Sequence, residues 1–491
     1  MKHKGSYSVR VTVPDINAPT RAGVAFTLIN VLSKLAALLF TPIFTRIFSK
    51  EGYGEYSLFV SLLSVTVVLC SLEMSGGVIM RVLQKERRVA SLCLLSAYAA
   101  VAALCCVIVP AVAFIARKYG ILLFPYSALI LFIYVASEAI IGLYLSYARF
   151  LYRWQPVALS AFASSISAPL LGIALIRISA PDMHVTARLG AASGILAAVA
   201  VAFVILTVRA AGRELCVLGI RLPSAVKKAV YLLRLLLRLA IPMLPYYAAV
   251  MAISQSGRLF LAHGYSNAAV AEYSVAHTLG IAPSSVFSGI SAALSPWVMR
   301  KVRAENISAL RRVINLCLTV YSLLIICYLT VSDILLSFIA PPEYSAALPI
   351  AFITAASTVP LSLTQIMTSI SLAKEHTRAT SACGIAIGVA AVILSWLFVP
   401  RLGALFAAAV SAAGFLLLAV CGTVAASRAV GKSLIGVPHA LFLPCLVIIG
   451  ALVIYALGAY AAARYAILLI SLTVTGVVLY KNRSLLSEGK I

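Results

Sequence analysis

The sequence has 491 residues, of which 63% are hydrophobic and only 11% are charged, with a mean hydropathy of +1.06. Soluble domains carry about 25% charged residues, so this composition excludes a soluble enzyme whose whole surface faces water. The 39 Lys and Arg outnumber the 14 Asp and Glu and give a formal net charge of +25, which on a soluble protein would indicate a nucleic-acid partner. The composition instead predicts an all-α integral membrane protein.

Fourteen apolar runs are long enough to be transmembrane helices, because a helix needs about 20 mostly apolar residues to cross a bilayer. We expect these spans at 22–46, 55–79, 89–115, 121–146, 157–177, 189–208, 239–262, 268–296, 313–338, 347–372, 380–399, 403–424, 438–457 and 465–480. For the last two runs a re-entrant pair is the alternative interpretation. Residues 1–21 are polar, and no cleavable signal peptide is expected there.

Lys and Arg residues concentrate in alternate loops. One set of loops, together with both termini, carries 29 of them, whereas the other set carries 8. Loops that remain in the cytoplasm carry the excess of Lys and Arg, so both termini are predicted to be cytoplasmic in a multi-pass membrane protein. The same asymmetry accounts for most of the net charge, and no nucleic-acid partner is expected.

A long basic segment, 209–238, divides the chain into two halves. In it Lys227, Tyr231, Arg234 and Arg238 recur at helical spacing on one face, which predicts a basic amphipathic helix in the membrane interface. The expected organisation is a cytoplasmic tail at 1–21, an N-lobe of six spans at 22–208, the connector at 209–238, a C-lobe of six spans at 239–424, and two further spans with the cytoplasmic C-terminus at 425–491.

The two halves share an internal repeat. Four short matches occur in the same order at offsets of 212, 217, 219 and 213 residues. They pair Arg46-Ile47-Phe48 with Arg258-Leu259-Phe260, Glu55-Tyr56-Ser57 with Glu272-Tyr273-Ser274, Val78-Ile79-Met80-Arg81 with Trp297-Val298-Met299-Arg300, and Arg188-Leu189-Gly190-Ala191 with Arg401-Leu402-Gly403-Ala404. Repeats of six spans enter the membrane the same way round. The repeat therefore predicts two six-helix lobes around a central cavity, with two additional C-terminal helices.

Basic residues inside the spans are candidates for function, because a charge in the hydrocarbon layer is costly. Lys34 lies about 12 residues, or about 18 Å, from either end of its span, too far for its side chain to reach water by extending along the helix. It must face either a watery cavity or a buried acid such as Glu73. Arg258, preceded by the polar Gln255, is a second candidate for the cavity, and snorkelling is its alternative; Arg46 is its partner in the repeat.

Two acids lie inside predicted spans, Glu73 near the cytoplasmic end of the second and Glu138 deep in the fourth. Each could relay a proton or hold a coupling ion, or could neutralise a buried Lys or Arg. Arg81 and Arg300 lie at the predicted cytoplasmic entrance. Pro242 and Pro245 are expected to kink or break the seventh span.

No catalytic pattern emerges from the sequence. The six histidines are scattered without metal-ligand spacing, and phosphate-binding Gly-rich loops, HExxH and GxSxG are absent. We therefore expect no catalytic residue, no metal and no cofactor.

Several stretches resemble the polysaccharide-transporter branch (Wzx-type flippases) of the multidrug/oligosaccharidyl-lipid/polysaccharide exporter superfamily. The motifs are Asn30-Val31 through Lys34 to Pro42-Ile43-Phe44-Thr45-Arg46, then Tyr53-Gly54-Glu55-Tyr56, Arg258-Leu259, Glu272-Tyr273-Ser274, Glu343-Tyr344 with Ala346-Ala347, and Val399-Pro400 with Gly403-Ala404. Two features depart from the family pattern. Many relatives have 12 spans, and Gly257 stands where an acid often precedes the arginine of the seventh span.

The resemblance implies alternating access by two lobes, with the first, second, seventh and eighth spans lining the path. It implies that the substrate is an oligosaccharide linked to undecaprenyl pyrophosphate. The protein would move it from the inner to the outer leaflet of the bacterial cytoplasmic (inner) membrane for assembly of O-antigen, capsule or exopolysaccharide. A polysaccharide polymerase and a chain-length regulator would be its partners. The pyrophosphate or sugar would meet Lys34, Arg46, Gln255 and Arg258. Alternatives are a lipid II-type flippase, a cation-coupled drug antiporter of the same superfamily, and, from another class, a membrane-embedded polysaccharide polymerase or ligase.

Overall fold

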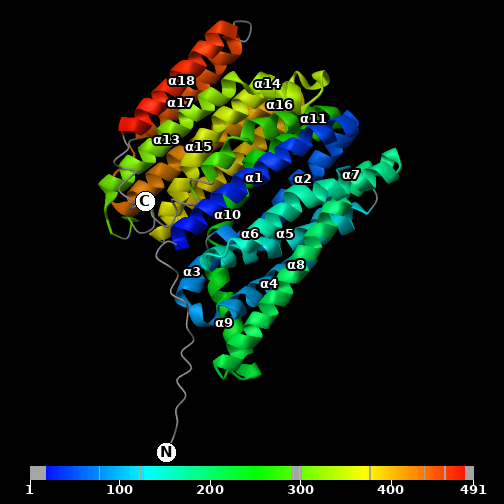
Figure 1. Ribbon diagram of the computed structural model, residues 1–491, viewed down its shortest axis with the longest axis vertical. Coiled ribbons are helices and arrows are strands. Elements are labelled where there is room, and N and C mark those ends of the chain that lie inside the picture. The colour runs from blue at the N-terminus through cyan, green and yellow to red at the C-terminus, as the bar shows by residue number, and fades with distance from the viewer. Residues whose placement is uncertain are drawn as a thin grey trace, which may run out of the picture.

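The structure, a computed structural model, is helical wherever it has regular secondary structure among the residues it describes. It describes residues 18–481 except 77, 122–123, 125, 289–290, 292–297, 299–300, 303, 375–376, 436 and 458–460. The fold is the expected all-α membrane fold of two lobes and an additional C-terminal helix pair (Figure 1). The prediction of the fold class is thereby confirmed.

The N-lobe comprises the first eight α-helices. They are α1 (Ala18–Ile47), α2 (Lys50–Ser71), α3 (Val78–Lys85), α4 (Ala90–Lys118), α5 (Ser127–Phe150), α6 (Gln155–Phe162), α7 (Ala168–Ile178) and α8 (His184–Val217). A single π-helical turn at Ala163–Ser167 joins α6 to α7, so these two helices form one apolar span.

The connector and the second half follow. They contain α9 (Leu222–Ala240), α10 (Leu244–Gly264), α11 (Asn267–Ile281), α13 (Ile307–Thr330), α14 (Ser332–Ile339), α15 (Ala347–Ala373), α16 (Thr377–Val430), α17 (Val437–Ala456) and α18 (Ala461–Lys481). In Figure 1, α1 crosses the front of the molecule, with α5, α7 and α8 on one side of it and α13, α15 and α16 on the other.

Ten of the described helices are long and apolar enough to cross a membrane, or 11 if one bent pair is counted as a span. The number of 14 therefore stays a prediction. The longest element, α16, has 54 residues, and its backbone is non-helical at Gly403, with φ 79° and ψ −163°, so it consists of two helices that meet at a kink. The kink lies at the boundary of the two spans predicted there, 380–399 and 403–424.

The bent pair is formed by α9 and α10, whose axes meet at 54°. The break contains Pro242, and Pro245 occupies the first turn of α10. Proline lacks the backbone N–H and clashes with the preceding turn, so it favours a helix start over a helix interior. The predicted break at the start of the seventh span is confirmed.

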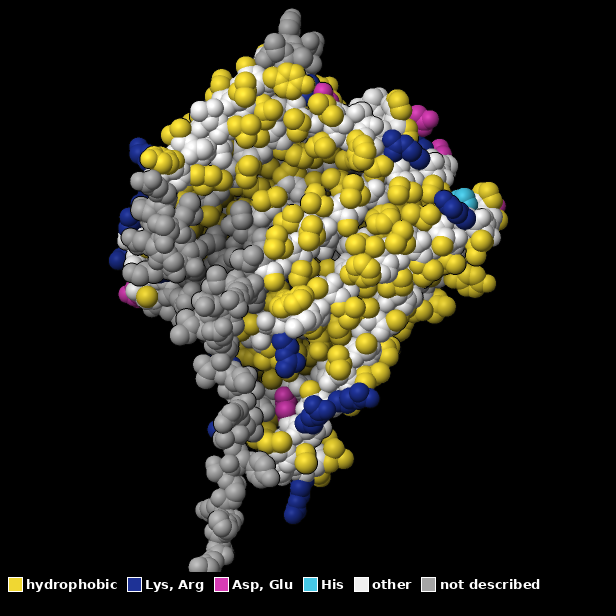
Figure 2. All heavy atoms as spheres, viewed as in Figure 1, with side chains coloured by type: hydrophobic (Ala, Val, Ile, Leu, Met, Phe, Trp, Pro, Cys, Tyr) yellow, Lys and Arg dark blue, Asp and Glu magenta, His cyan; other side chains and the backbone are white. Residues whose placement is uncertain are grey.

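Most of the surface visible in Figure 2 is hydrophobic, and the Lys and Arg side chains lie mainly towards its ends and edges. Large apolar side chains such as Val107, Phe114, Trp396 and Ile449 are more than half exposed. Exposure on this scale is excluded for a monomer in water, whereas it is expected where side chains face lipid. The chain is a multi-pass membrane protein.

The two lobes meet at one end of the bundle, which we call the Lys50 end; the opposite end, where α9 lies, is the connector end. At the Lys50 end, Lys50 of α2 forms an ion pair of 2.5 Å with Glu272 of α11. Thr45 donates a hydrogen bond of 2.9 Å to the Ile339 carbonyl. Arg46 donates one of 3.3 Å to the Phe338 carbonyl. These contacts tie the α1–α2 hairpin to the second half of the chain.

The helix starts at the Lys50 end also show the repeat in three dimensions. Ser49 Oγ accepts the Gly52 N–H at the start of α2, and Ser266 Oγ accepts the Ala269 N–H at the start of α11. Both are N-caps, which satisfy otherwise unpaired N–H groups of the first turn. The two serines lie 217 residues apart, the offset of the Glu55 and Glu272 motifs.

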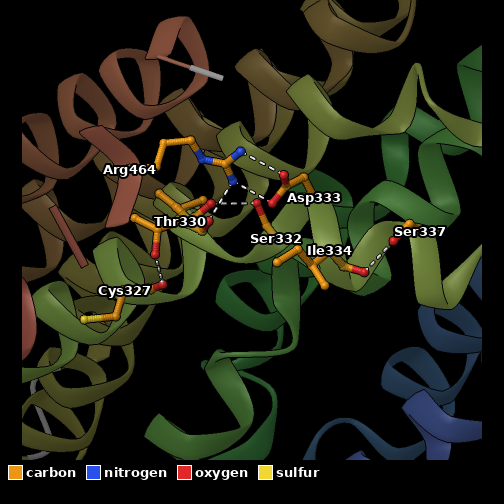
Figure 3. Close-up of polar contacts among 8 residues, drawn as sticks. Cys327, Thr330, Ser332, Asp333, Ile334, Ser337 and Arg464 are labelled. Carbon is orange, nitrogen blue, oxygen red and sulfur yellow. Dashed lines mark hydrogen bonds and ion pairs between the residues drawn. The ribbon is translucent and has the colours of Figure 1, made fainter. Parts of the chain in front are cut away.

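The α17–α18 pair is anchored to the rest of the second half by one charged cluster (Figure 3). The Arg464 guanidinium of α18 binds both carboxylate oxygens of Asp333, at 2.8 and 2.5 Å, and the Thr330 carbonyl at 2.6 Å. Bidentate pairs of this kind are stronger than single ion pairs. The Arg464 guanidinium, which hydrogen-bonds the Asp333 carboxyl, holds the pKa of that carboxyl below its usual range.

We expect Asp333→Asn to lower the thermal unfolding temperature of the purified protein by a few degrees at pH 7. Because the pKa of Asp333 is depressed in the folded state, its stabilising contribution is present above the unfolded pKa of about 3.9 and is lost as the pH falls through the folded pKa. The difference between parent and variant, measured by differential scanning fluorimetry in detergent, should therefore shrink as the pH falls below about 4. Asp182→Asn, at an exposed site, is the control. An equal difference at every pH would contradict the pairing.

Candidate functional site

Lys34 lies close to the middle of α1 and is exposed. The apolar stripe of α1 that is most exposed, Leu28, Leu32, Leu35 and Leu39, lies on the opposite side of the helix from Lys34 at 100° per residue. The ammonium therefore points away from this lipid-facing side and is nevertheless accessible. Lys34 is thus a charged group that is exposed near the middle of a span, on a side of α1 other than its most exposed apolar side.

The same face of α1 becomes buried towards the Lys50 end. Thr41 and Thr45, which follow Lys34 at about two and three helical turns, are only 8% and 3% exposed. The exposed part of this face of α1 therefore ends between Lys34 and the Lys50 end.

Glu138 occupies the midpoint of α5 and is exposed, although its neighbours Ser137 and Ala139 are buried. The Lys34 ammonium lies within electrostatic range of the Glu138 carboxylate. The acid that the charge of Lys34 acts on is thus Glu138, on another helix of the same lobe. Tyr134, one turn nearer the Lys50 end, also lies within range of Glu138. We call Lys34, Glu138 and Tyr134 the central cluster.

Aromatic rings continue from the central cluster towards the Lys50 end. Phe44 and Phe48 of α1 stack at 5.7 Å between centroids, and Tyr56 of α2 lies 6.0 Å from Phe48 and 5.9 Å from Tyr53. Tyr56 is also within electrostatic range of Tyr134. Aromatic faces are suitable surfaces for the apolar faces of sugar rings and for cations.

Arg258 and Gln255 lie together on α10 and are buried, at 7% and 8% exposure. The Arg258 Nη1 donates to Gln255 Oε1 at 3.0 Å and to Ser61 Oγ of α2 at 3.1 Å, whereas its Nε is buried without a partner in the described residues. Arg258 therefore joins the two lobes in this state, and its unsatisfied Nε leaves a donor free for another acceptor.

The other predicted residues are dispersed. Arg46 lies exposed in the last turn of α1, where it also donates to the Pro42 carbonyl at 2.9 Å. Glu73 follows α2 in a left-handed conformation, with φ 47°. Its carboxylate accepts a hydrogen bond from Ser75 and lies within range of Tyr247 on α10. Arg81 lies half-buried on α3. Arg300 lies outside the described residues.

One basic residue was misplaced by the sequence pattern. Arg188 was expected in the loop between the fifth and sixth spans, but α8 begins at His184, so Arg188 lies in its second turn and is 92% buried. A cation close to a span end is usually explained by access to the interface, and for this reason the residue did not stand out. Its recurrence in the internal repeat was the only sequence signal.

The basic groups can act as hydrogen-bond donors. Lys34 and Arg258 are suited to phosphate or carboxylate groups, and Arg258 lies where the two lobes meet. Among the described residues, no three His, Cys, Asp or Glu side chains come together as a metal site.

One family model and one solved structure agree with this architecture. A family model described as polysaccharide biosynthesis protein matches residues 20–302. The structure is similar to the lipid II flippase MurJ in its inward closed conformation, with a TM-score of 0.61 and 14% identity over 95% of this chain and 100% of that chain. It also aligns with the Vibrio cholerae MATE transporter VcmN in the bent form, with a TM-score of 0.45 and 14% identity over 84% of this chain and 98% of that chain. No curated protein matches the sequence.

We expect a cysteine at position 138 to react with a water-soluble maleimide at least tenfold faster than cysteines at two matched positions in a cysteine-free background. Val135 lies one turn away and is fully buried, and Val107 is 71% exposed on the lipid side of α4. A thiol reacts through its thiolate, which forms in water and not in hydrocarbon. Labelling at 107 as fast as at 138, measured by mass shift, would contradict an aqueous site between the lobes.

Proposed function

The chain belongs to the polysaccharide biosynthesis protein family, and from this membership we propose that it is a flippase for undecaprenyl-pyrophosphate-linked oligosaccharide. It moves this lipid from the inner to the outer leaflet of the bacterial cytoplasmic membrane, for assembly of a surface polysaccharide such as O-antigen or capsule. The observation that carries the proposal is the exposed Lys34 near the middle of α1, within electrostatic range of Glu138 on α5. A multi-pass fold shared with a lipid flippase supports it.

In this mechanism the oligosaccharide and pyrophosphate enter the space between the lobes, while the undecaprenyl chain remains in the lipid. Lys34 donates to the pyrophosphate, and Glu138 keeps the ammonium oriented when the site is empty. An ammonium at mid-membrane lowers the energy of an anion that would otherwise cross a low-dielectric layer, where an uncompensated charge costs several kcal/mol. The sugars then meet Tyr134 and Tyr56, which lie next along the path.

The Lys50 end is proposed to be the outer gate. Lys50, Thr45 and Arg46 hold the lobes together there, and the face of α1 that carries the exposed Lys34 is buried at Thr41 and Thr45 towards that end. With the connector end in the cytoplasm, as the distribution of Lys and Arg predicts, this is a state open to the inner leaflet. Rocking of the lobes exchanges it for a state open at the Lys50 end, in which Arg258 loses Ser61 and can meet the substrate.

A lipid II-type flippase is the second candidate, because the structural similarity to MurJ covers nearly the whole chain. The substrates of both candidates have a diphosphate on an isoprenoid chain, and they differ in the sugar. A drug antiporter would need free acids for cationic drugs, whereas Glu138 faces Lys34. The alternative from another class is a membrane-embedded polymerase or ligase. The product distinguishes it from a flippase, because such an enzyme lengthens or transfers the glycan.

We expect proteoliposomes of the parent protein to translocate undecaprenyl-pyrophosphate-linked oligosaccharide, measured by accessibility of the sugar to an external oxidant or glycosidase. Lys34→Gln should slow translocation by about tenfold or more, because a charge-assisted hydrogen bond contributes about 1.5–3 kcal/mol. Lys118→Gln, which neutralises an exposed lysine at the Lys50 end of α4, should leave the rate unchanged.

Equal rates for Lys34→Gln and the parent would remove Lys34 from the path. Movement of lipid II in preference to the oligosaccharide would favour the second candidate. Lengthening or transfer of the glycan without movement across the bilayer would replace the flippase proposal by the polymerase or ligase.

The outer gate gives a separate prediction. Lys50→Glu places a carboxylate against Glu272 and should weaken the closed state through like-charge repulsion, so that a cysteine at the buried Ser57 is labelled several-fold faster by an impermeant reagent from the outside. The swapped pair Lys50→Glu with Glu272→Lys should restore slow labelling. Unchanged labelling in the single variant would show that this ion pair does not hold the gate.

A further inference from the structure

Arg188 is a buried cation that the proposed mechanism has not used. It lies in the second turn of α8, is 8% exposed, and its Nε and Nη1 atoms are buried without a hydrogen-bond partner in the described part of the chain. No described carboxylate forms an ion pair with it. Buried charges in proteins are ordinarily paired or hydrogen-bonded.

The side chain is nevertheless held in one place by packing. Its guanidinium carbon lies 4.8 Å from the Phe44 ring centroid and 5.9 Å from that of Tyr56. Its stem passes α7 at Gly172, where an added Cβ would lie 2.7 Å from Arg188 Cδ. The two aromatic rings position the cation, and the glycine makes room for it.

These contacts do not satisfy the guanidinium. A cation–π contact recovers only part of the free energy that it costs to move a charged group out of water. The aromatic faces also leave the in-plane N–H donors of Nε and Nη1 without acceptors in the described residues. The arrangement is that of a preformed site whose missing partner is an anion with several oxygens.

Its position relates it to the central cluster. Arg188 lies four residues, or about 6 Å, from the start of α8, and Lys34 lies 13 residues, or about 20 Å, from the end of α1. Both helix ends belong to the Lys50 end of the bundle. Tyr134 is within electrostatic range of both Glu138 and Arg188, so it connects the central cluster with Arg188.

We propose that Arg188 is a second anion-binding station of the path, which receives the diphosphate of the lipid-linked sugar after Lys34 and nearer the Lys50 end. The inference rests on the proposed function for its substrate and on the geometry for its site. A guanidinium presents donors in a planar fork that matches two phosphate oxygens, whereas an ammonium is a point charge. The diphosphate is the same in all such substrates, whereas the sugars differ. Because Arg188 is held in a fixed position relative to Lys34, it suits the invariant diphosphate better than the variable sugars.

The test is binding of inorganic pyrophosphate to the purified full-length protein in detergent, by isothermal titration calorimetry, with thermal unfolding measured on the same samples. We expect Arg188→Gln to weaken binding by about tenfold or more. Arg188→Lys should weaken it several-fold, because it keeps the charge and loses the fork. Two matched controls should bind as the parent does: Arg177→Gln, an exposed arginine on α7, and Arg401→Gln, the exposed repeat counterpart of Arg188.

Gly172→Ala provides a variant that keeps the charge. Its Cβ would meet the Arg188 stem, so it should displace the guanidinium and weaken pyrophosphate binding even if Arg188→Gln fails to fold. A lower unfolding temperature with unchanged pyrophosphate affinity in these variants would show that Arg188 only supports packing and would overturn the station. Parent protein that does not bind pyrophosphate would overturn it as well.

Failure of the station and failure of the function are distinguishable. If the parent translocates the lipid in proteoliposomes and Arg188→Gln translocates and binds as the parent does, the flippase stands and the station is wrong. If the parent binds pyrophosphate through Arg188 but moves no lipid, the site stands and the flippase is wrong.

Discussion

The constraint on which the structure depends is the absence of water in the hydrocarbon layer. Backbone groups must pair within helices there, and each charge must lie at an end, face a partner or face an aqueous space. The charged residues of this chain are distributed accordingly. Asp333 and Arg464 pair at a helix end, and Lys34 points away from the lipid-facing leucines. Among the described residues, buried nitrogens of Arg188 and Arg258 lack a hydrogen-bond partner, as does the Nε of Arg464, whose other nitrogens bind Asp333 and Thr330. Arg188 and Arg258, for which no ion pair with a described carboxylate is found, are therefore informative about a ligand.

Features that depend on residues close together in the sequence could be predicted, whereas contacts between distant segments could not. Lys34 could be identified because no path along one helix takes its ammonium to water, which is a local argument. Its facing acid could not, since Glu138 lies on α5, and neither spacing nor composition brings α1 and α5 together. The helix types and the break at Pro242 follow from local rules in the same way. The number of spans does not, because α11 is short and α16 consists of two helices that meet at a kink.

Arg188 shows the limit most clearly. Because Arg188 lies near a span end, access to the membrane interface was enough to explain its charge. Its burial follows from the packing of α7 against α8 at Gly172, which the sequence does not show. Lys50 and Glu272 show the same limit, since their ion pair joins residues 222 positions apart. Each is a tertiary contact, and the internal repeat is the one sequence feature that brought some of these segments to attention.

The contact of Gly54 with the Asn267 backbone has a consequence for kinetics. At Gly54 an added Cβ would lie 1.9 Å from the Asn267 carbonyl oxygen, so two helix starts approach there backbone to backbone. The close approach lets buried apolar side chains of both halves, such as Tyr53, Leu58 and Tyr273, pack in one cluster beside it. Separation of the lobes at this end therefore exposes apolar surface as well as breaking polar contacts, and opening is slower than loss of the ion pair and hydrogen bonds alone would make it.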